Sequence, residues 1–66
     1  MVNTKLLDVY IKESGLKVFD IASSLNISEI SFWKKKNNIK DFKVSEMDML
    51  CDILNIGADA VNIFFP

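Results

Sequence analysis

The sequence predicts an all-α fold, a compact five-helix bundle in one domain, and three observations support this. The chain has 66 residues, enough for one domain at most. Its apolar residues recur at the three- and four-residue spacing of amphipathic helices. Only two glycines and one proline occur, and the β-branched residues do not alternate with polar ones. We therefore expect residues 1–66 to form a single helical domain.

The first helix is expected at about residues 4–14, with Asn3 or Thr4 as its cap. Gly15 can end it in a left-handed turn. Its apolar face comprises Leu6, Leu7, Tyr10 and Ile11.

The second helix is expected at about residues 18–25, with Ile21, Ala22 and Leu25 facing the core. Asn26 then takes a left-handed turn, which asparagine tolerates well, and Ile27 fills the turn.

Ser28 is expected to cap a third helix over about residues 29–37, with Glu29 near its positive end and Phe32 as the inward anchor. An irregular connection over residues 39–43 and a fourth helix over about residues 44–54 follow. The inward residues of the fourth helix are Met47, Leu50, Cys51 and Leu54. A last short helix carries Val61, Ile63, Phe64 and Phe65. The two phenylalanines are expected to seal the bundle, and the alternative is that one of them reaches a second chain.

Charge is distributed unevenly along the chain. The net charge of −1 argues against indiscriminate nucleic-acid binding. Residues 34–43 carry five lysines against one aspartate, whereas residues 44–66 carry four acidic residues and no lysine. The chain contains no arginine, glutamine or histidine.

No candidate site for catalysis, a metal or a cofactor emerges. The sequence offers no histidine, no ligand cluster, no Gly-rich phosphate loop and no nucleophile–base pair, so we do not expect an enzyme. Cys51 is the only cysteine, and its helical spacing with Met47 and Leu54 favours a core position over a reactive thiol. No apolar run is long enough for a signal peptide or a membrane span.

The segment Ile21-Ala-Ser-Ser-Leu-Asn-Ile-Ser28 resembles the helix-turn-helix core of the phage Cro and repressor family. That core has a small residue in its first helix, here Ala22, and a turn residue able to adopt positive φ, here Asn26. Phe32 matches its apolar anchor, and residues 6–16 and 41–56 also resemble the family. The resemblance implies a fold like that of lambda repressor and Cro and a role in transcriptional control.

The resemblance also implies that the third helix lies in the major groove and that the start of the second helix meets phosphate. The base-facing positions are then Ser28, Glu29, Ile30, Trp33 and Lys34, and the phosphate-facing ones are Lys17, Val18 and Phe19. Direct readout relies on Arg, Lys, Asn or Gln, and two of these residue types are missing from the chain. The face offers apolar area instead, unless Phe19 and Trp33 pack back into the domain.

Two interpretations of the lysine run stay open. The run is either a solvated helix end, which the helix dipole favours, or a patch that follows phosphate or an acidic protein surface. The lysines concerned are Lys34, Lys35, Lys36, Lys40 and Lys43.

The sequence favours a phage-type helix-turn-helix regulator of the lysis–lysogeny switch, acting as an antirepressor on the DNA-binding domain of a partner repressor. It then resembles the modulators of repression that some temperate phages of Gram-positive bacteria encode in place of Cro. The alternative is a Cro-like DNA-binding transcriptional repressor on operator DNA. Either would work in the cytoplasm of the bacterial host, without a membrane or a small-molecule ligand. The expected partner- or DNA-binding face comprises Lys17, Val18, Phe19, Ser28, Glu29, Ile30, Trp33, Lys34, Lys36 and Lys40.

Overall fold

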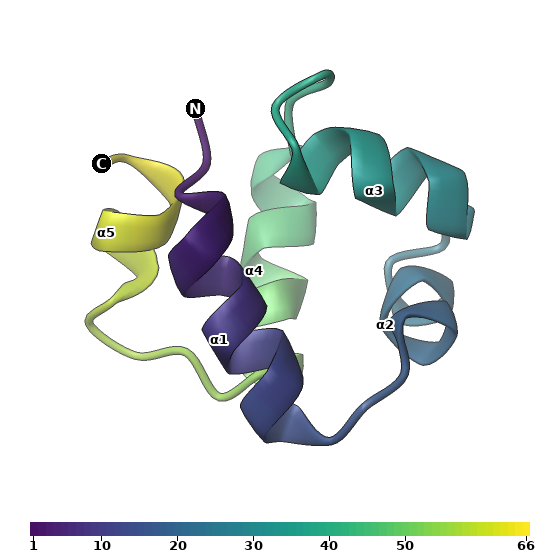
Figure 1. Ribbon diagram of the computed structural model, residues 1–66, viewed down its shortest axis with the longest axis horizontal. Helices are drawn as coiled ribbons and strands as arrows, with labels where there is room; N and C mark the ends of the chain where they lie inside the picture. The colour runs from purple at the N-terminus through teal and green to yellow at the C-terminus, as the bar shows by residue number, and fades with distance from the viewer.

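Five α-helices and no strands make up the regular structure of the chain (Figure 1). The computed structural model describes all residues, 1–66. The helices are α1 (Thr4–Ser14), α2 (Val18–Ser24), α3 (Glu29–Lys36), α4 (Val44–Ile53) and α5 (Ala60–Phe64). The expected all-α fold is confirmed, and α2, α3 and α4 each end one residue earlier than expected. None of the five helices combines the length and the apolar character that a membrane crossing requires.

Local residues begin and end the helices near the expected positions. The Asn3 side chain caps α1 by accepting a hydrogen bond from the Leu6 N–H at 3.2 Å, and Gly15 ends this helix with φ 70°. Asn26 has φ 59°, which lets the chain turn between α2 and α3 over only four residues. The Ser28 hydroxyl then caps α3 by accepting a hydrogen bond from the Ser31 N–H at 3.0 Å.

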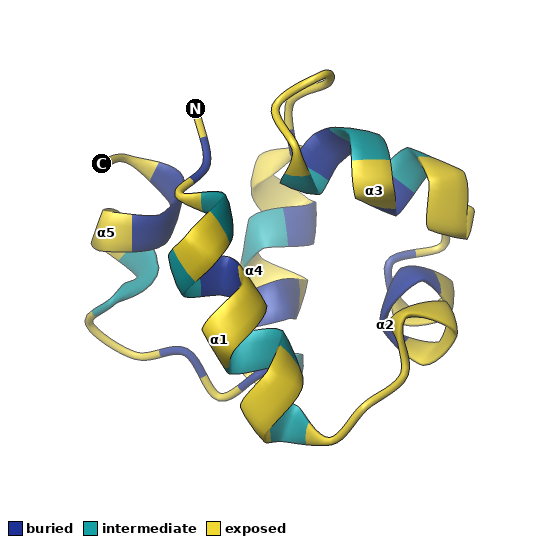
Figure 2. Cartoon of the chain, in the orientation of Figure 1, coloured by how far each residue is buried: buried dark blue, intermediate teal, exposed yellow.

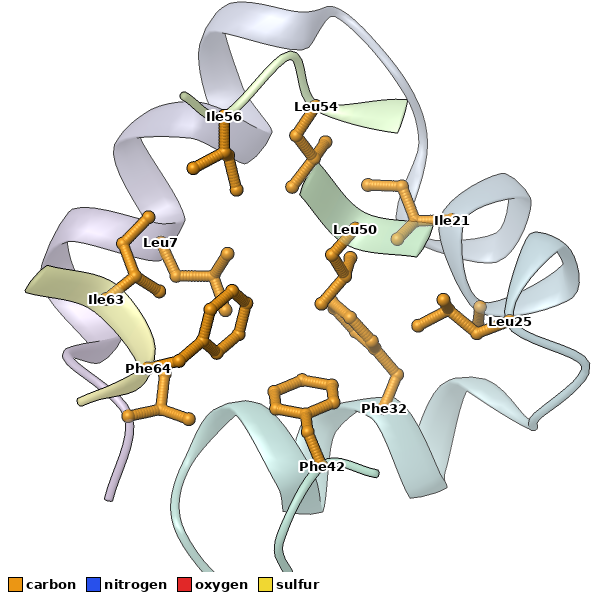
Figure 3. Close-up of a cluster of buried hydrophobic side chains, with 12 residues drawn as sticks. Leu7, Ile21, Leu25, Phe32, Phe42, Leu50, Leu54, Ile56, Ile63 and Phe64 are labelled. Carbon is orange, nitrogen blue, oxygen red and sulfur yellow. The ribbon is translucent and has the colours of Figure 1, made fainter. Parts of the chain in front are cut away.

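One hydrophobic core, with contributions from all five helices, holds the bundle together (Figure 3). Its largest fully buried side chains are Phe32, Leu7, Ile21, Leu50 and Ile63. The Phe42 ring lies edge-on between two other rings, with centroid distances of 5.9 Å to Phe32 and 6.0 Å to Phe64. Such pairs contribute about 0.5–1.5 kcal/mol beyond their burial. The 39–43 connection, expected only as an irregular segment, therefore supplies a central core residue.

Lys35 is buried in the fold and is not part of a solvated lysine run. Its Nζ lies 2.8 Å from both carboxylate oxygens of Glu46 on α4. Oε1 of Glu46 also accepts a hydrogen bond from the Lys43 N–H at 2.8 Å, which caps the start of α4. Neither interpretation of the lysine run therefore holds for Lys35, because the helical period places it on the same side as Phe32.

The N-terminal segment also fixes the C-terminal end of α3. The Asn38 side chain accepts a hydrogen bond from the Val2 N–H at 2.6 Å and donates one to the Val2 carbonyl at 3.0 Å. The Thr4 hydroxyl donates to the Lys36 carbonyl at 2.6 Å, and Lys36 Nζ lies 2.9 Å from Asp8 Oδ1. These contacts hold the C-terminal end of α3 against the start of α1.

Replacing one member of the buried ion pair should destabilise the protein strongly. Glu46→Gln should lower the free energy of unfolding by about 3 kcal/mol, because Lys35 then stays buried without a counter-charge. The double variant Lys35→Met with Glu46→Leu leaves no unpaired charge and should recover most of this loss. Urea unfolding followed by circular dichroism measures both effects. A double variant no more stable than Glu46→Gln would show that the unpaired charge of Lys35 is not the cause of the loss.

The same pair should make stability depend on pH. Burial alone raises the pKa of Glu46, but the hydrogen bonds from Lys35 and the Lys43 N–H, together with both positive charges, hold it below 4.5. Because this folded-state pKa is depressed, the pair stabilises the protein above the unfolded-state value, and the contribution is lost as pH falls through the folded-state pKa. Urea midpoints measured from neutral to acidic pH should fall less steeply for Glu46→Gln than for the parent chain.

Candidate functional site

The inward anchors of α3 determine which of its residues face solvent. Phe32 is fully buried and Lys35 is 8% exposed, so this side of α3 faces the core. At about 3.6 residues per turn, Ile30 and Trp33 lie on the opposite side. Their exposed fractions are 69% and 54%. The alternative in which Trp33 packs back into the domain is not observed.

Helix α2 places a second large apolar side chain next to this surface. Ile21 and Ala22 are buried, and α2 packs on both α3 and α4. Phe19 is 62% exposed, and Val18 beside it is 37% exposed. The outer side of α2 and the start of α3 are both exposed in Figure 2. Phe19 therefore points to solvent as Trp33 does, and does not seal the bundle.

A shallow hollow lies between α2 and α3 and joins these side chains. It is lined by Phe19, Ala22, Ser23, Ile27, Ser28, Glu29 and Ile30. Ala22 and Ser23 are small, so space remains between the larger side chains of Phe19 and Ile30. We use the name α2–α3 face for the surface formed by this lining together with Trp33. Ser23 was not predicted as part of the site, although its four-residue spacing from Phe19 places both on one side of α2.

Glu29 is the one ionisable residue that lines the hollow. It is exposed and takes part in neither of the two ion pairs of the chain, Lys35–Glu46 and Lys36–Asp8. Glu29 is the first residue of α3, so the positive end of the helix dipole stabilises its carboxylate. The α2–α3 face therefore combines apolar area with a single carboxylate that has no cation beside it.

The predicted lysines do not form one patch. Lys17 and Lys40 are exposed, and Lys34 is half-buried. The Lys40 N–H donates to the Lys34 carbonyl at 3.2 Å, so the backbones of these two residues are close together. Lys36 was predicted for the binding face, but its side chain is 19% exposed and pairs with Asp8 on α1. That prediction is wrong because residue 36 lies on the side of α3 that meets α1.

A second apolar surface lies on α4 and α5. Its lining residues are Val44, Met47, Asp48, Cys51, Ala60, Val61, Phe64 and Phe65. Phe64 is buried as expected, but Phe65 is 69% exposed, so the prediction that it seals the bundle is wrong. Phe65 follows the last residue of α5, where the helical period no longer directs it inward.

The chemistry of Cys51 fits a packing role. Its side chain is half-buried on α4. Burial, foremost, and the charges of Asp48 and Asp52 raise the pKa of the Cys51 thiol. The reactive thiolate form is therefore disfavoured.

Neither a protein-family model, nor a curated protein, nor a solved structure matches this chain. The residues and geometry of the α2–α3 face are therefore the basis for a functional proposal.

Substitutions on this face should leave stability nearly unchanged. Phe19→Ala and Ile30→Ala should each change the free energy of unfolding by less than about 0.5 kcal/mol, because both side chains lie mostly in water. Phe32→Ala, in contrast, should cost about 3–5 kcal/mol because it leaves a cavity in the core. Urea unfolding measures all three variants. A loss for Phe19→Ala as large as that for Phe32→Ala would show that Phe19 supports the core.

Proposed function

We propose that this chain is a phage-type helix-turn-helix regulator that acts as an antirepressor, with the α2–α3 face covering the DNA-binding domain of a partner repressor. The observation that carries the proposal is the exposure of Phe19, Ile30 and Trp33 where a groove-reading protein would present hydrogen-bonding side chains. The resemblance of residues 21–28 to the Cro and repressor family supplies the regulatory context.

The apolar area supports binding to a protein. The exposed parts of Phe19, Ile30 and Trp33 amount to roughly 350 Å², or roughly 9 kcal/mol of gross hydrophobic free energy when buried. A stable interface buries about 800 Å² on each partner, so these three residues would form its centre and polar neighbours its rim. Large aromatic side chains in such a centre are typical binding hot spots.

Electrostatics also favours a protein partner over a duplex. Glu29 stands at the start of α3, where a DNA reader approaches phosphates and base edges. Its carboxylate would repel phosphate there. A DNA-binding domain is basic on its reading surface, so the same carboxylate would attract it.

A Cro-like DNA-binding repressor remains the second candidate function. Lys17 and Lys40 are exposed and are available for phosphate. Lys35 and Lys36 are each paired with a carboxylate, which leaves fewer free cations for a duplex than the sequence indicates.

Parallel binding assays distinguish the two functions. The purified chain should form a complex with its cognate phage repressor and should release that repressor from its operator in a gel shift. Ile30→Ala and Trp33→Ala should each weaken this complex by about tenfold or more. Val61→Ala is the matched control, because Val61 is also exposed but lies on α5.

A DNA-binding repressor would give the opposite result. If the chain alone shifts the operator with a steep dependence on salt, and forms no complex with the repressor, it is a DNA-binding repressor.

A further inference from the structure

The hollow on the α2–α3 face has the form of a socket. Ala22 is 1% exposed, and Ile27 next to it is half-buried and packs on the core, so these residues close the hollow toward the interior. Phe19 and Ile30 stand 62% and 69% exposed on either helix and border it. The hollow therefore has apolar walls and a closed base, unlike a flat hydrophobic patch.

The backbone around the socket keeps it open. The Ile27 N–H donates to the Ala22 carbonyl at 3.0 Å, which fixes the turn after α2. Asn26 holds positive φ in the same turn, and Ser28 caps the helix that follows. Because these local bonds set the spacing of α2 and α3, the hollow exists before any partner binds, and binding requires little ordering.

The rim of the socket carries one charge. Glu29 lines the hollow, is exposed and has no ion-pair partner, and no lysine belongs to the lining. The partner side chain that fills the socket should therefore be apolar. A positively charged side chain next to it on the partner would interact favourably with Glu29.

We infer that this socket takes one apolar side chain from a helix of the partner, and that a lysine or arginine beside that side chain pairs with Glu29. The inference rests on the proposed function and specifies the chemistry of the partner at this site. The occupant is a basic amphipathic helix, because its apolar side chain matches the walls and its cation matches the rim. A phosphate group fits neither feature.

Filling the socket from within tests the inference. Ser23→Leu places an apolar side chain in the lining, whereas Ser24→Leu makes the same change at the next residue of α2, outside the lining. Both serines are exposed, so both variants should keep the circular dichroism spectrum of the parent chain. Binding is measured by calorimetry against the isolated DNA-binding domain of the cognate phage repressor. Ser23→Leu should weaken binding by about tenfold or more, and Ser24→Leu by less than about twofold.

The charge at the rim is tested separately. Glu29→Gln keeps the shape of the side chain and removes its charge, so the complex should become weaker and less sensitive to salt. Glu13→Gln removes an exposed carboxylate on α1 and should change neither property.

Each other outcome overturns a defined part of the proposal. If the parent chain binds the repressor domain and Ser23→Leu binds as well as Ser24→Leu, the socket is not used, although the proposed function stands. If Glu29→Gln tightens the complex, the partner presents an acidic group and not a cation. If no complex forms and Glu29→Gln strengthens operator binding, both the socket and the antirepressor function are wrong.

Discussion

The burial of Phe32 and Lys35 on one side of α3 is the constraint on which the rest of the structure depends. A helix of eight residues is too short to be stable alone, so its orientation comes from packing. Phe32 supplies an apolar anchor in the core, and Lys35 supplies a polar anchor through Glu46 on α4. With both fixed, helical geometry leaves Ile30 and Trp33 no position except the outer surface. The arrangement of the α2–α3 face is thus a consequence of how the core is built.

Much of the fold can be predicted from local signals in the sequence. Gly15, Asn26 and Ser28 stand at helix ends for reasons of backbone conformation and capping, which need no knowledge of the tertiary structure. The outward positions of Phe19 and Trp33 were implied by the resemblance, while packing back into the domain stayed open as the alternative. What the sequence did not reveal depends on contacts between distant residues. Phe42 lies in an irregular segment without periodicity, and its burial depends on Phe32 and Phe64.

The lysine run is a second feature whose burial depends on contacts between distant residues. Three consecutive lysines resemble a solvated helix end, because burial of a lone charge is costly. That cost is offset for Lys35 only because Glu46, eleven residues later, comes within hydrogen-bond distance after α4 packs. Lys36 is likewise paired with an acidic residue of α1. A local excess of positive charge in the sequence therefore becomes a smaller excess on the surface, which weakens the case for a phosphate-binding patch.

The apolar residues are divided between the core and the surface, and this division bears on function. Twelve hydrophobic residues form the core, and as many large hydrophobic side chains are exposed. Isolated exposed residues such as Val9 need no explanation, but contiguous ones mark interaction sites. Phe19 and Ile30 line one hollow and share it with Glu29, and the surface on α4 and α5 likewise combines an apolar lining with one carboxylate, that of Asp48. Apolar area alone would permit nonspecific hydrophobic association. A hollow with an unpaired charge in its lining restricts the partner by shape and by sign. The α2–α3 face is the stronger candidate because it also carries residues 21–28, the segment that resembles a helix-turn-helix core.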